Sequence, residues 1–63
     1  MRNLRIAAGL TQQQVADALG ISRSTVAMWE CGKSSPLFDN LERLGDLYGC
    51  GIEAIVIALR KAS

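Results

Sequence analysis

The sequence predicts an all-α, compact domain built from five short helices. Apolar residues recur at helical spacing in five successive segments, and no segment alternates apolar and polar residues as a half-buried strand does. Glycines and a single proline separate the segments, as expected of turns between helices. The chain has 63 residues, of which 49% are hydrophobic, which is enough for one small core, so we expect a single domain over residues 1–63.

The first predicted helix is short and ends at Gly9. Four residues at helical spacing share one of its faces, namely Met1, Leu4, Arg5 and Ala8. Leu10 can turn inward after the glycine, ahead of the second helix. This segment therefore contributes one short amphipathic helix to the core.

Thr11 marks the start of the second predicted helix, at about Gln12. Its hydroxyl can accept a hydrogen bond from a free backbone N–H of the first turn, and Gln14 completes a capping-box pattern. Three apolar residues form the inward stripe of this helix, Val15, Ala16 and Leu19. Gly20 follows, and because glycine adopts the left-handed conformation without a Cβ penalty, the chain can turn sharply there.

Ser22 is expected to cap a third helix over residues 23–31, with Ile21 packed into the corner before it. The inner face of this helix carries Val26, Trp29 and Glu30, and the opposite face carries Arg23, Ser24, Ala27 and Met28. Two amphipathic helices joined at a glycine form a helix-turn-helix over about residues 12–31, which indicates double-stranded DNA as the partner. A helix of roughly 13 Å fits a major groove ~12 Å wide. An ordinary helical hairpin shows the same two stripes and glycine, so the motif alone leaves both interpretations open.

Ser34, Ser35 and Pro36 are predicted to form a loop before two further helices. The fourth helix is traced by Leu37, Leu41, Leu44 and Tyr48, with Leu47 beside them, and is closed by Gly49 and Gly51. The fifth helix is traced by Ile52, Ile55, Val56 and Leu59 and ends in Arg60 and Lys61. These two positive charges suit a helix C-terminus.

Many positions agree with one known pattern, namely Thr11, Gln12, Val15, Ala16, Leu19, Gly20, Ile21, Ser22, Val26, Trp29, Glu30, Gly32 and Lys33. In these residues the chain resembles the phage repressor and Cro family of helix-turn-helix domains. The likeness continues in LRIAAGLTQ before the motif, and in Pro36, Leu41, Leu44 and the stretch YGCGIEAI after it. The resemblance implies a lambda-repressor-like fold and a bacterial or phage transcriptional regulator that recognises a DNA sequence, most often a repressor occupying its operator.

Two charged residues, Arg5 and Glu30, fall on inner stripes of the first and third predicted helices. Buried charges are tolerated when they are paired. In the family, an arginine and a glutamate at the matching positions form a salt bridge, so the resemblance implies a structural pair between Arg5 and Glu30. The alternative is that both side chains extend to solvent.

The outer face of the third helix supplies the candidate base-reading residues. Arg23 can give a guanine two hydrogen-bond donors, although a phosphate salt bridge is the alternative. Ser24 can reach a base edge, and Ala27 or Met28 can meet a thymine methyl group, although Met28 can equally be an exposed filler. Cys31 stands where the family commonly has a polar or basic residue, and Met28 replaces a frequent polar reader, so these departures weaken the match.

Family position implies a second set of residues that hold phosphates without reading sequence, namely Gln12, Ser22, Thr25, Lys33 and Asn40. The net charge of the chain is only +1. We therefore expect a single domain to bind DNA weakly and with strong salt dependence.

Three residues of the fifth helix lie off its predicted core stripe, Ala54, Ile57 and Ala58. An exposed Ile57 suggests a surface for a second copy. Such a homodimer would present its recognition helices ~34 Å apart and favour an inverted-repeat operator. The alternative is that Ile57 is one scattered apolar residue on the surface.

Several function classes are excluded by the residues that the chain lacks. It contains no run of eighteen apolar residues and no signal-peptide pattern, so we expect a cytoplasmic protein without a membrane partner. With no histidine and no CxxC, its Cys31 and Cys50 form neither a zinc site nor a Cys-His nucleophile, and Cys50 is expected in the core. We therefore expect no enzyme, cofactor, metal or small-molecule ligand. A protein-interaction module of the antitoxin or adaptor kind is the alternative function.

Overall fold

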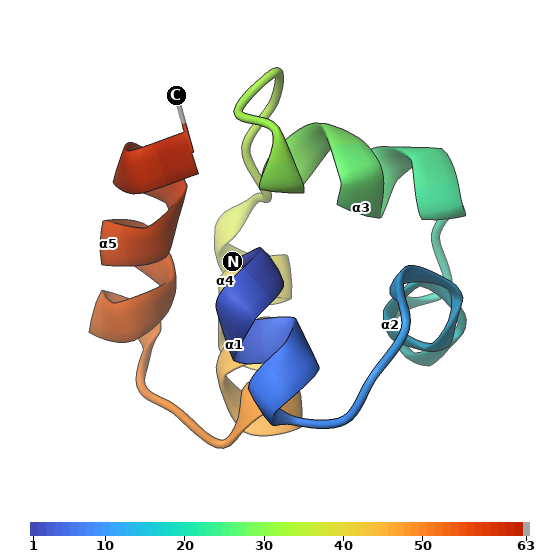
Figure 1. The fold of residues 1–63 in the computed structure, drawn as a ribbon, viewed down its shortest axis with the longest axis horizontal. Coiled ribbons are helices and arrows are strands. Elements are labelled where there is room, and N and C mark those ends of the chain that lie inside the picture. The colour runs from blue at the N-terminus through green and yellow to red at the C-terminus, as the bar shows by residue number, and fades with distance from the viewer. Residues whose placement is uncertain (63) are drawn as a thin grey trace.

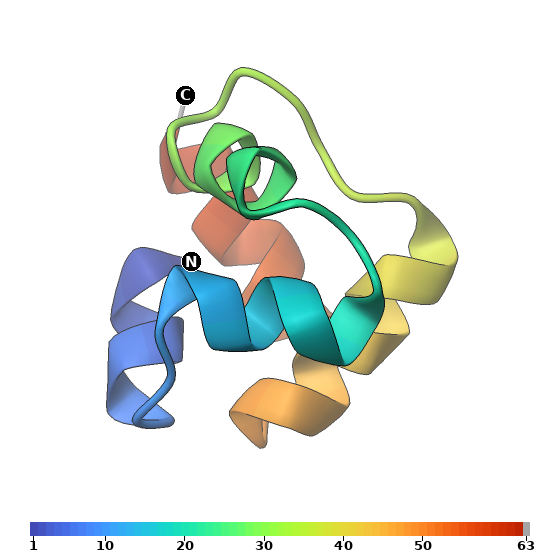
Figure 2. The ribbon, with the colours of Figure 1, turned by 90° about the vertical axis from the view of Figure 1, so that its right-hand side faces the viewer.

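The computed structural model describes residues 1–62, and this part of the chain is all-helical as predicted. The helices in chain order are α1 (Arg2–Ala7), α2 (Gln12–Leu19), α3 (Arg23–Glu30), α4 (Phe38–Tyr48) and α5 (Ile52–Ala62). In Figure 1, α5 lies on the left, α1 lies in front of α4, and α2 and α3 form the right and upper parts. Figure 2, turned by 90°, shows α3 crossing above α2 and the chain after α3 arching over to α4.

The core joins four of the helices. The largest side chains that are fully buried come one each from α2, α3, α4 and α5, namely Val15, Val26, Leu44 and Ile55. Ala16, Leu19 and Trp29 are buried with them, so the inward stripes predicted for α2 and α3 are confirmed. Removing this apolar surface from water is the main force that holds such short helices together.

The first helix differs from the prediction at its end. Met1 and Arg5 are buried and Leu4 is partly buried, as expected, but Ala8 is exposed. The reason is that α1 ends at Ala7, so Ala8 already belongs to the turn before Gly9 and leaves the inner face. The prediction for Ala8 was therefore wrong.

The fourth helix begins one residue later than its apolar spacing suggests. Leu37 has an extended backbone before the first turn of α4, and its side chain is 79% exposed. Leu37 therefore does not belong to the inner stripe, which consists of Leu41, Leu44 and Tyr48. Phe38, the first residue of α4, is also exposed, so the start of this helix carries two neighbouring apolar side chains on the surface.

Candidate nucleic-acid interface

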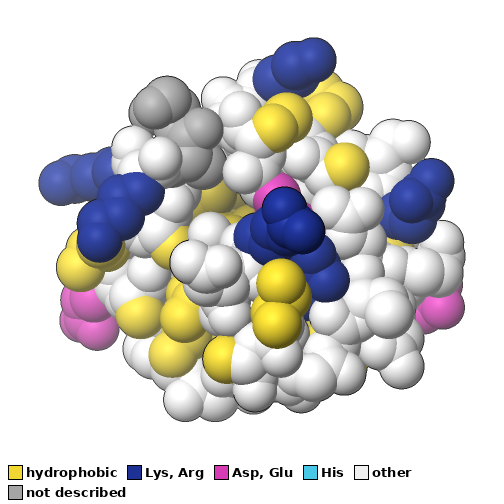
Figure 3. Space-filling view, in the orientation of Figure 1, with side chains coloured by type: hydrophobic (Ala, Val, Ile, Leu, Met, Phe, Trp, Pro, Cys, Tyr) yellow, Lys and Arg dark blue, Asp and Glu magenta, His cyan; other side chains and the backbone are white. Residues whose placement is uncertain are grey.

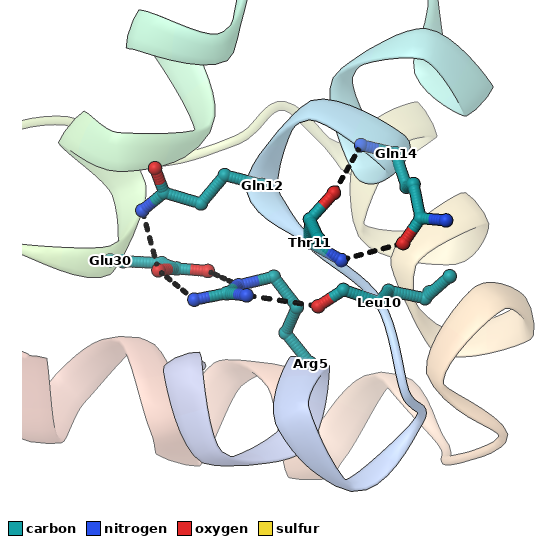
Figure 4. A network of polar contacts seen from close by, with 6 residues as sticks. All are labelled: Arg5, Leu10, Thr11, Gln12, Gln14 and Glu30. Carbon is teal, nitrogen blue, oxygen red and sulfur yellow. Dashed lines mark hydrogen bonds and ion pairs between the residues drawn. The ribbon is translucent and has the colours of Figure 1, made fainter.

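Hydrogen bonds of a capping box hold the start of α2 where the sequence predicts it. The hydroxyl oxygen of Thr11 accepts the Gln14 N–H at 3.1 Å, and the Thr11 N–H donates to Oε1 of Gln14 at 2.8 Å. Figure 4 shows this reciprocal pair beside a second, larger network. The capping box therefore fixes the direction in which the first turn of α2 faces.

The turn between α2 and α3 uses a left-handed glycine followed by a serine cap. Gly20 has φ of 71°, and the N–H of Ile21 donates back to the carbonyl of Ala16 at 3.0 Å. The hydroxyl oxygen of Ser22 then accepts the Thr25 N–H at 3.2 Å. These bonds end one helix and begin the next within three residues, and they set the helix-turn-helix geometry.

The structure brings Arg5 and Glu30 together as an ion pair between α1 and α3. Nε of Arg5 donates to Oε2 of Glu30 at 2.7 Å, and Nη2 donates to Oε1 at 3.3 Å. The same guanidinium donates to the carbonyl of Leu10 at 2.9 Å, and the amide of Gln12 donates to Oε1 of Glu30 at 3.0 Å. The two charged side chains are only 11% and 6% exposed, so the ion pair (Figure 4) is mostly shielded from water.

The ionisation of Glu30 follows from these contacts. Burial opposes the charged form, but the hydrogen bonds from Arg5 and Gln12 and the charge of Arg5 outweigh it, so the pKa of Glu30 lies below its ordinary value. The hydrogen bond to Glu30 favours the charged form of Arg5 as well, and it therefore raises the pKa of Arg5. The pair is therefore fully ionised at neutral pH and contributes no net charge to the surface above it.

The four predicted base-reading residues lie on the outer side of α3. Arg23 and Ser24 are exposed, Met28 is 43% exposed, and Ala27 is partly exposed. Within the described part of the chain, neither the Arg23 nor the Ser24 side chain has a hydrogen-bond partner. α3 ends at Glu30, one residue before the predicted end, so Cys31 belongs to the turn that follows.

The five predicted phosphate-binding residues differ in their exposure, in their hydrogen bonds and in their place in the fold. Gln12 is half-buried with its amide committed to Glu30, and the hydroxyls of Ser22 and Thr25 bond to each other at 2.9 Å. Lys33 is exposed in the loop after α3, whereas Asn40 is half-buried in the first turn of α4. The structure thus places three of them around α2 and α3 and two beyond.

An open hollow of about 760 Å³ lies between α1, the start of α2 and α3. Its lining includes Arg2, Thr11, Gln12, Arg23, Ala27 and Cys31 above the Arg5–Glu30 pair. Arg2 was missed by sequence reasoning, because α1 was considered only for its inner face. The sequence did contain one indication that Arg2 lies near this site, since Arg2 precedes Arg5 by three residues and therefore lies on the same side of α1.

The surface predicted for a second copy lies along α5. Ile57 is 53% exposed as expected, and Ala54 is partly buried. Ala58 packs against the core, so the prediction that it lies off the core stripe was wrong. Ala54, Ile57 and Ala58 line a groove of about 380 Å³ together with Leu4 of α1 and with Met1, which precedes that helix. Figure 3 shows hydrophobic side chains gathered on this face between α1 and α5.

No helix within residues 1–62 is long and apolar enough to span a membrane. Among the described side chains, no cluster of His, Cys, Asp and Glu is able to hold a metal ion.

Comparisons with known proteins agree on one family. The sequence profile of the helix-turn-helix family matches residues 1–55. The chain is 34% identical over 56 residues to the cryptic phage CTXphi transcriptional repressor RstR of Vibrio cholerae, covering 89% of this chain and 50% of that protein.

Two further relatives are each 30% identical over 56 residues, again 89% of this chain. They are the HTH-type transcriptional activator BcrR of Enterococcus faecalis, of which 28% is covered, and the SPbeta prophage-derived uncharacterized HTH-type transcriptional regulator YonR of Bacillus subtilis (strain 168), of which 52% is covered. The chain thus spans half or less of the length of most of these curated relatives. No solved structure is significantly similar to it. With the capped turn, the paired Arg5 and Glu30, and a profile that spans most of its length, the chain belongs to the helix-turn-helix family.

Proposed function

We propose that this chain binds double-stranded DNA in a sequence-specific manner and thereby regulates transcription. The observation that carries the proposal is the outer side of α3, where Arg23 and Ser24 are exposed and have no partner within the described residues. The core fixes the opposite side of the same helix through Val26 and Trp29. A rigid helix with unused donors on its free side suits insertion into a major groove.

We assign the base-reading role to Arg23, Ser24, Ala27 and Met28. Arg23 donates two hydrogen bonds to a guanine, and Ser24 contacts a neighbouring base edge. Ala27 and Met28 offer methyl groups to thymine. In this proposal Gln12, Ser22, Thr25, Lys33 and Asn40 contact phosphates and set the register of the helix.

Selection of bound duplexes from a random pool tests this proposal. We expect a defined motif, and we expect Arg23→Ala to relax the preference at one base pair by about 1–3 kcal/mol. Arg43→Ala is the matched control, because Arg43 is exposed on α4 and lines a separate depression with Ala18 and Asp46. Recovery of no motif, together with unchanged duplex binding by Arg23→Ala, would overturn the proposal.

The proposed regulator acts as a homodimer joined along α5. Glu53, Ile57 and Lys61 follow one another at intervals of one helical turn, and all three are exposed. In an antiparallel pair with its twofold axis at Ile57, Glu53 of each copy lies opposite Lys61 of the other. Ala54 beside them is small enough to let the two helices approach closely.

Sedimentation equilibrium tests this dimer. We expect the chain to dimerise at micromolar concentration and Ile57→Lys to sediment as a monomer. Ile6→Lys serves as the control, since Ile6 on α1 is equally exposed and lies outside the groove. A monomeric parent chain at high micromolar concentration would remove the proposed dimer for the isolated chain.

The regulatory outcome we favour is repression by occupying an inverted-repeat operator in the cytoplasm of a bacterium. Two relatives are of phage or prophage origin, and one of these is named a repressor. Activation is the other regulatory outcome, because a relative of similar identity is named an activator. In this proposal, repression and activation both depend on binding to DNA and not on catalysis.

A protein-interaction module is the second candidate, and one observation favours it. Leu37 and Phe38 at the start of α4 are 79% and 62% exposed, and they form an apolar surface that DNA binding does not require. If the selection yields no motif, this candidate becomes the preferred function.

A further inference from the structure

We propose that the DNA interface extends beyond the helix-turn-helix onto α1, where Arg2 binds a backbone phosphate of the DNA. This inference rests on the proposed function, because it names a further contact of the same surface. The partner group is a phosphodiester, which Arg2 binds without reading sequence. α1 thereby acts as an anchor beside the recognition helix.

The shape of the surface is the first reason. Arg2 and Arg23 belong to different helices, yet they line one open hollow together with the start of α2. An open hollow between two arginines admits an extended anionic chain, whereas a closed cavity does not. Figure 3 shows positively charged side chains in the middle of this face, where α1 lies in Figure 1, and a further one at the right-hand edge, on the side where α3 begins.

The charge balance within the hollow is the second reason. Of the three arginines in its lining, Arg5 is neutralised by Glu30, which lies at the same place. Arg2 and Arg23 are exposed, and neither has an ion-pair partner within residues 1–62. The hollow therefore carries two uncompensated positive charges, and a phosphate is the complementary group on DNA.

The position of Arg2 decides its role. Arg23 opens α3 and reaches base edges, whereas Arg2 lies on the other wall of the hollow, on a helix that does not enter the groove. A guanidinium in that position meets the DNA backbone next to the groove, and a fork of N–H donors matches phosphate oxygens. Arg2 is therefore a positioning residue that adds affinity on any sequence.

Fluorescence anisotropy with two duplexes tests the inference, one carrying the selected motif and one a scrambled sequence of equal length. We expect Arg2→Ala to weaken binding to both duplexes by the same factor, on the order of tenfold. We also expect the slope of log affinity against log salt to fall by about 0.9, the value for one phosphate contact. Arg2→Lys, which keeps the charge, should restore most of the slope.

Two comparisons separate this inference from the proposed function. Arg23→Ala should weaken the motif duplex more than the scrambled one, and Arg43→Ala should leave both affinities and the salt slope unchanged. If Arg23→Ala behaves in this way but Arg2→Ala binds like the parent, the contact at Arg2 is refuted and the proposed function stands. If the parent chain binds neither duplex, both proposals fail. Since Arg2 is exposed and has no partner among the described residues, Arg2→Ala should melt at the parent temperature.

Discussion

At the scale of single residues, the carboxylate of Glu30 accepts three hydrogen bonds that come from two other helices. It accepts hydrogen bonds from Arg5 on α1 and from Gln12 on α2, while it belongs to α3. One buried side chain thus connects three helices at the floor of the proposed DNA-binding surface. Its loss should therefore affect stability first, and the proposed DNA binding only as a consequence.

Glu30→Ala should destabilise the domain by about 3–5 kcal/mol, because it leaves the Arg5 guanidinium buried without a counter-charge. Urea unfolding at pH 7 measures the loss. Glu42→Ala, which removes an exposed carboxylate from α4, should change stability by less than about 0.5 kcal/mol. An unfolding curve for Glu30→Ala like that of the parent would show that the pair contributes nothing.

The same pair predicts how stability depends on pH. Because the pKa of Glu30 in the folded chain lies below its ordinary value of 4.5, the stabilisation is complete above about pH 4.5. It is lost as the pH falls through the folded-state pKa, when the carboxylate becomes protonated. Urea unfolding between pH 7 and pH 3 should show a steeper loss for the parent than for Glu30→Gln, which has no proton to gain. Equal slopes for the two proteins would contradict the assignment.

Tyr48→Phe should stabilise the domain, although most deletions of a hydroxyl do the opposite. The Tyr48 hydroxyl is buried and has no hydrogen-bond partner among the described residues, and such a group costs about 1–3 kcal/mol. Burial also raises the pKa of Tyr48 to about 12, so the parent should lose stability as the pH rises from about 10 through 12. Urea unfolding at pH 7 and pH 11 should show a gain of about 1 kcal/mol for Tyr48→Phe and no loss at high pH. A destabilised variant at pH 7 would mean that the hydroxyl is hydrogen-bonded in solution.

At the scale of elements, the packing of α4 against the turn before α5 depends on Gly45. A Cβ at this buried position would lie 2.8 Å from the backbone oxygen of Cys50, whose N–H donates to the Gly45 carbonyl at 2.9 Å. Gly45→Ala should therefore destabilise by about 1–3 kcal/mol through overpacking, even though alanine favours a helix by about 1 kcal/mol. Thermal unfolding followed by circular dichroism measures the shift.

Gly51→Ala provides the comparison for that experiment. A Cβ at Gly51 would meet only the flexible end of the Glu53 side chain, which can move away. The melting temperature of Gly51→Ala should therefore stay close to that of the parent. If Gly45→Ala melts at or above the parent temperature, the turn adapts and the backbone contact does not limit α4.

The same elements show how far sequence reasoning extends. The bounds of α2 and the start of α3 were predictable because Thr11, Gly20 and Ser22 act locally, through caps and a left-handed turn. The start of α4 was not, since Leu37 precedes Leu41 by one helical turn and has no side-chain cap to mark the boundary. Arg2 was missed for a different reason: its spacing from Arg5 places both on one side of α1, but the hollow that it shares with residues of α2 and α3 exists only in the folded chain.

At the scale of the whole molecule, the positions of the basic side chains matter more for the proposed DNA binding than the net charge of the chain. The chain carries 7 basic and 6 acidic residues, so its net charge provides little attraction to DNA. Arg5 and Glu30 cancel each other inside the fold, while Arg2, Arg23 and Lys33 stay exposed near α3. A surface of this kind binds DNA weakly as one copy, and this is why a second copy is part of the proposal.

The dimensions of the fold predict the operator that such a dimer selects. The Cα atoms of the domain extend over 23 × 23 × 21 Å, and α5 lies on the side opposite the start of α3 (Figure 1). Two copies joined along α5 thus carry their recognition helices far from the twofold axis, within reach of the ~34 Å between successive major grooves. The selected motif should be an inverted repeat with half-site centres about 10 base pairs apart.

An insertion of about 5 base pairs between the half-sites should then lower the affinity to that of a single half-site, because it moves one of them to the other side of the duplex. The same base pairs added outside the repeat should leave the affinity unchanged, and Ile57→Lys should bind all three duplexes with the affinity of a single half-site. Anisotropy titrations on these duplexes measure each value. If the parent chain binds the inserted duplex as tightly as the original, the two copies bind independently and α5 does not join them on DNA.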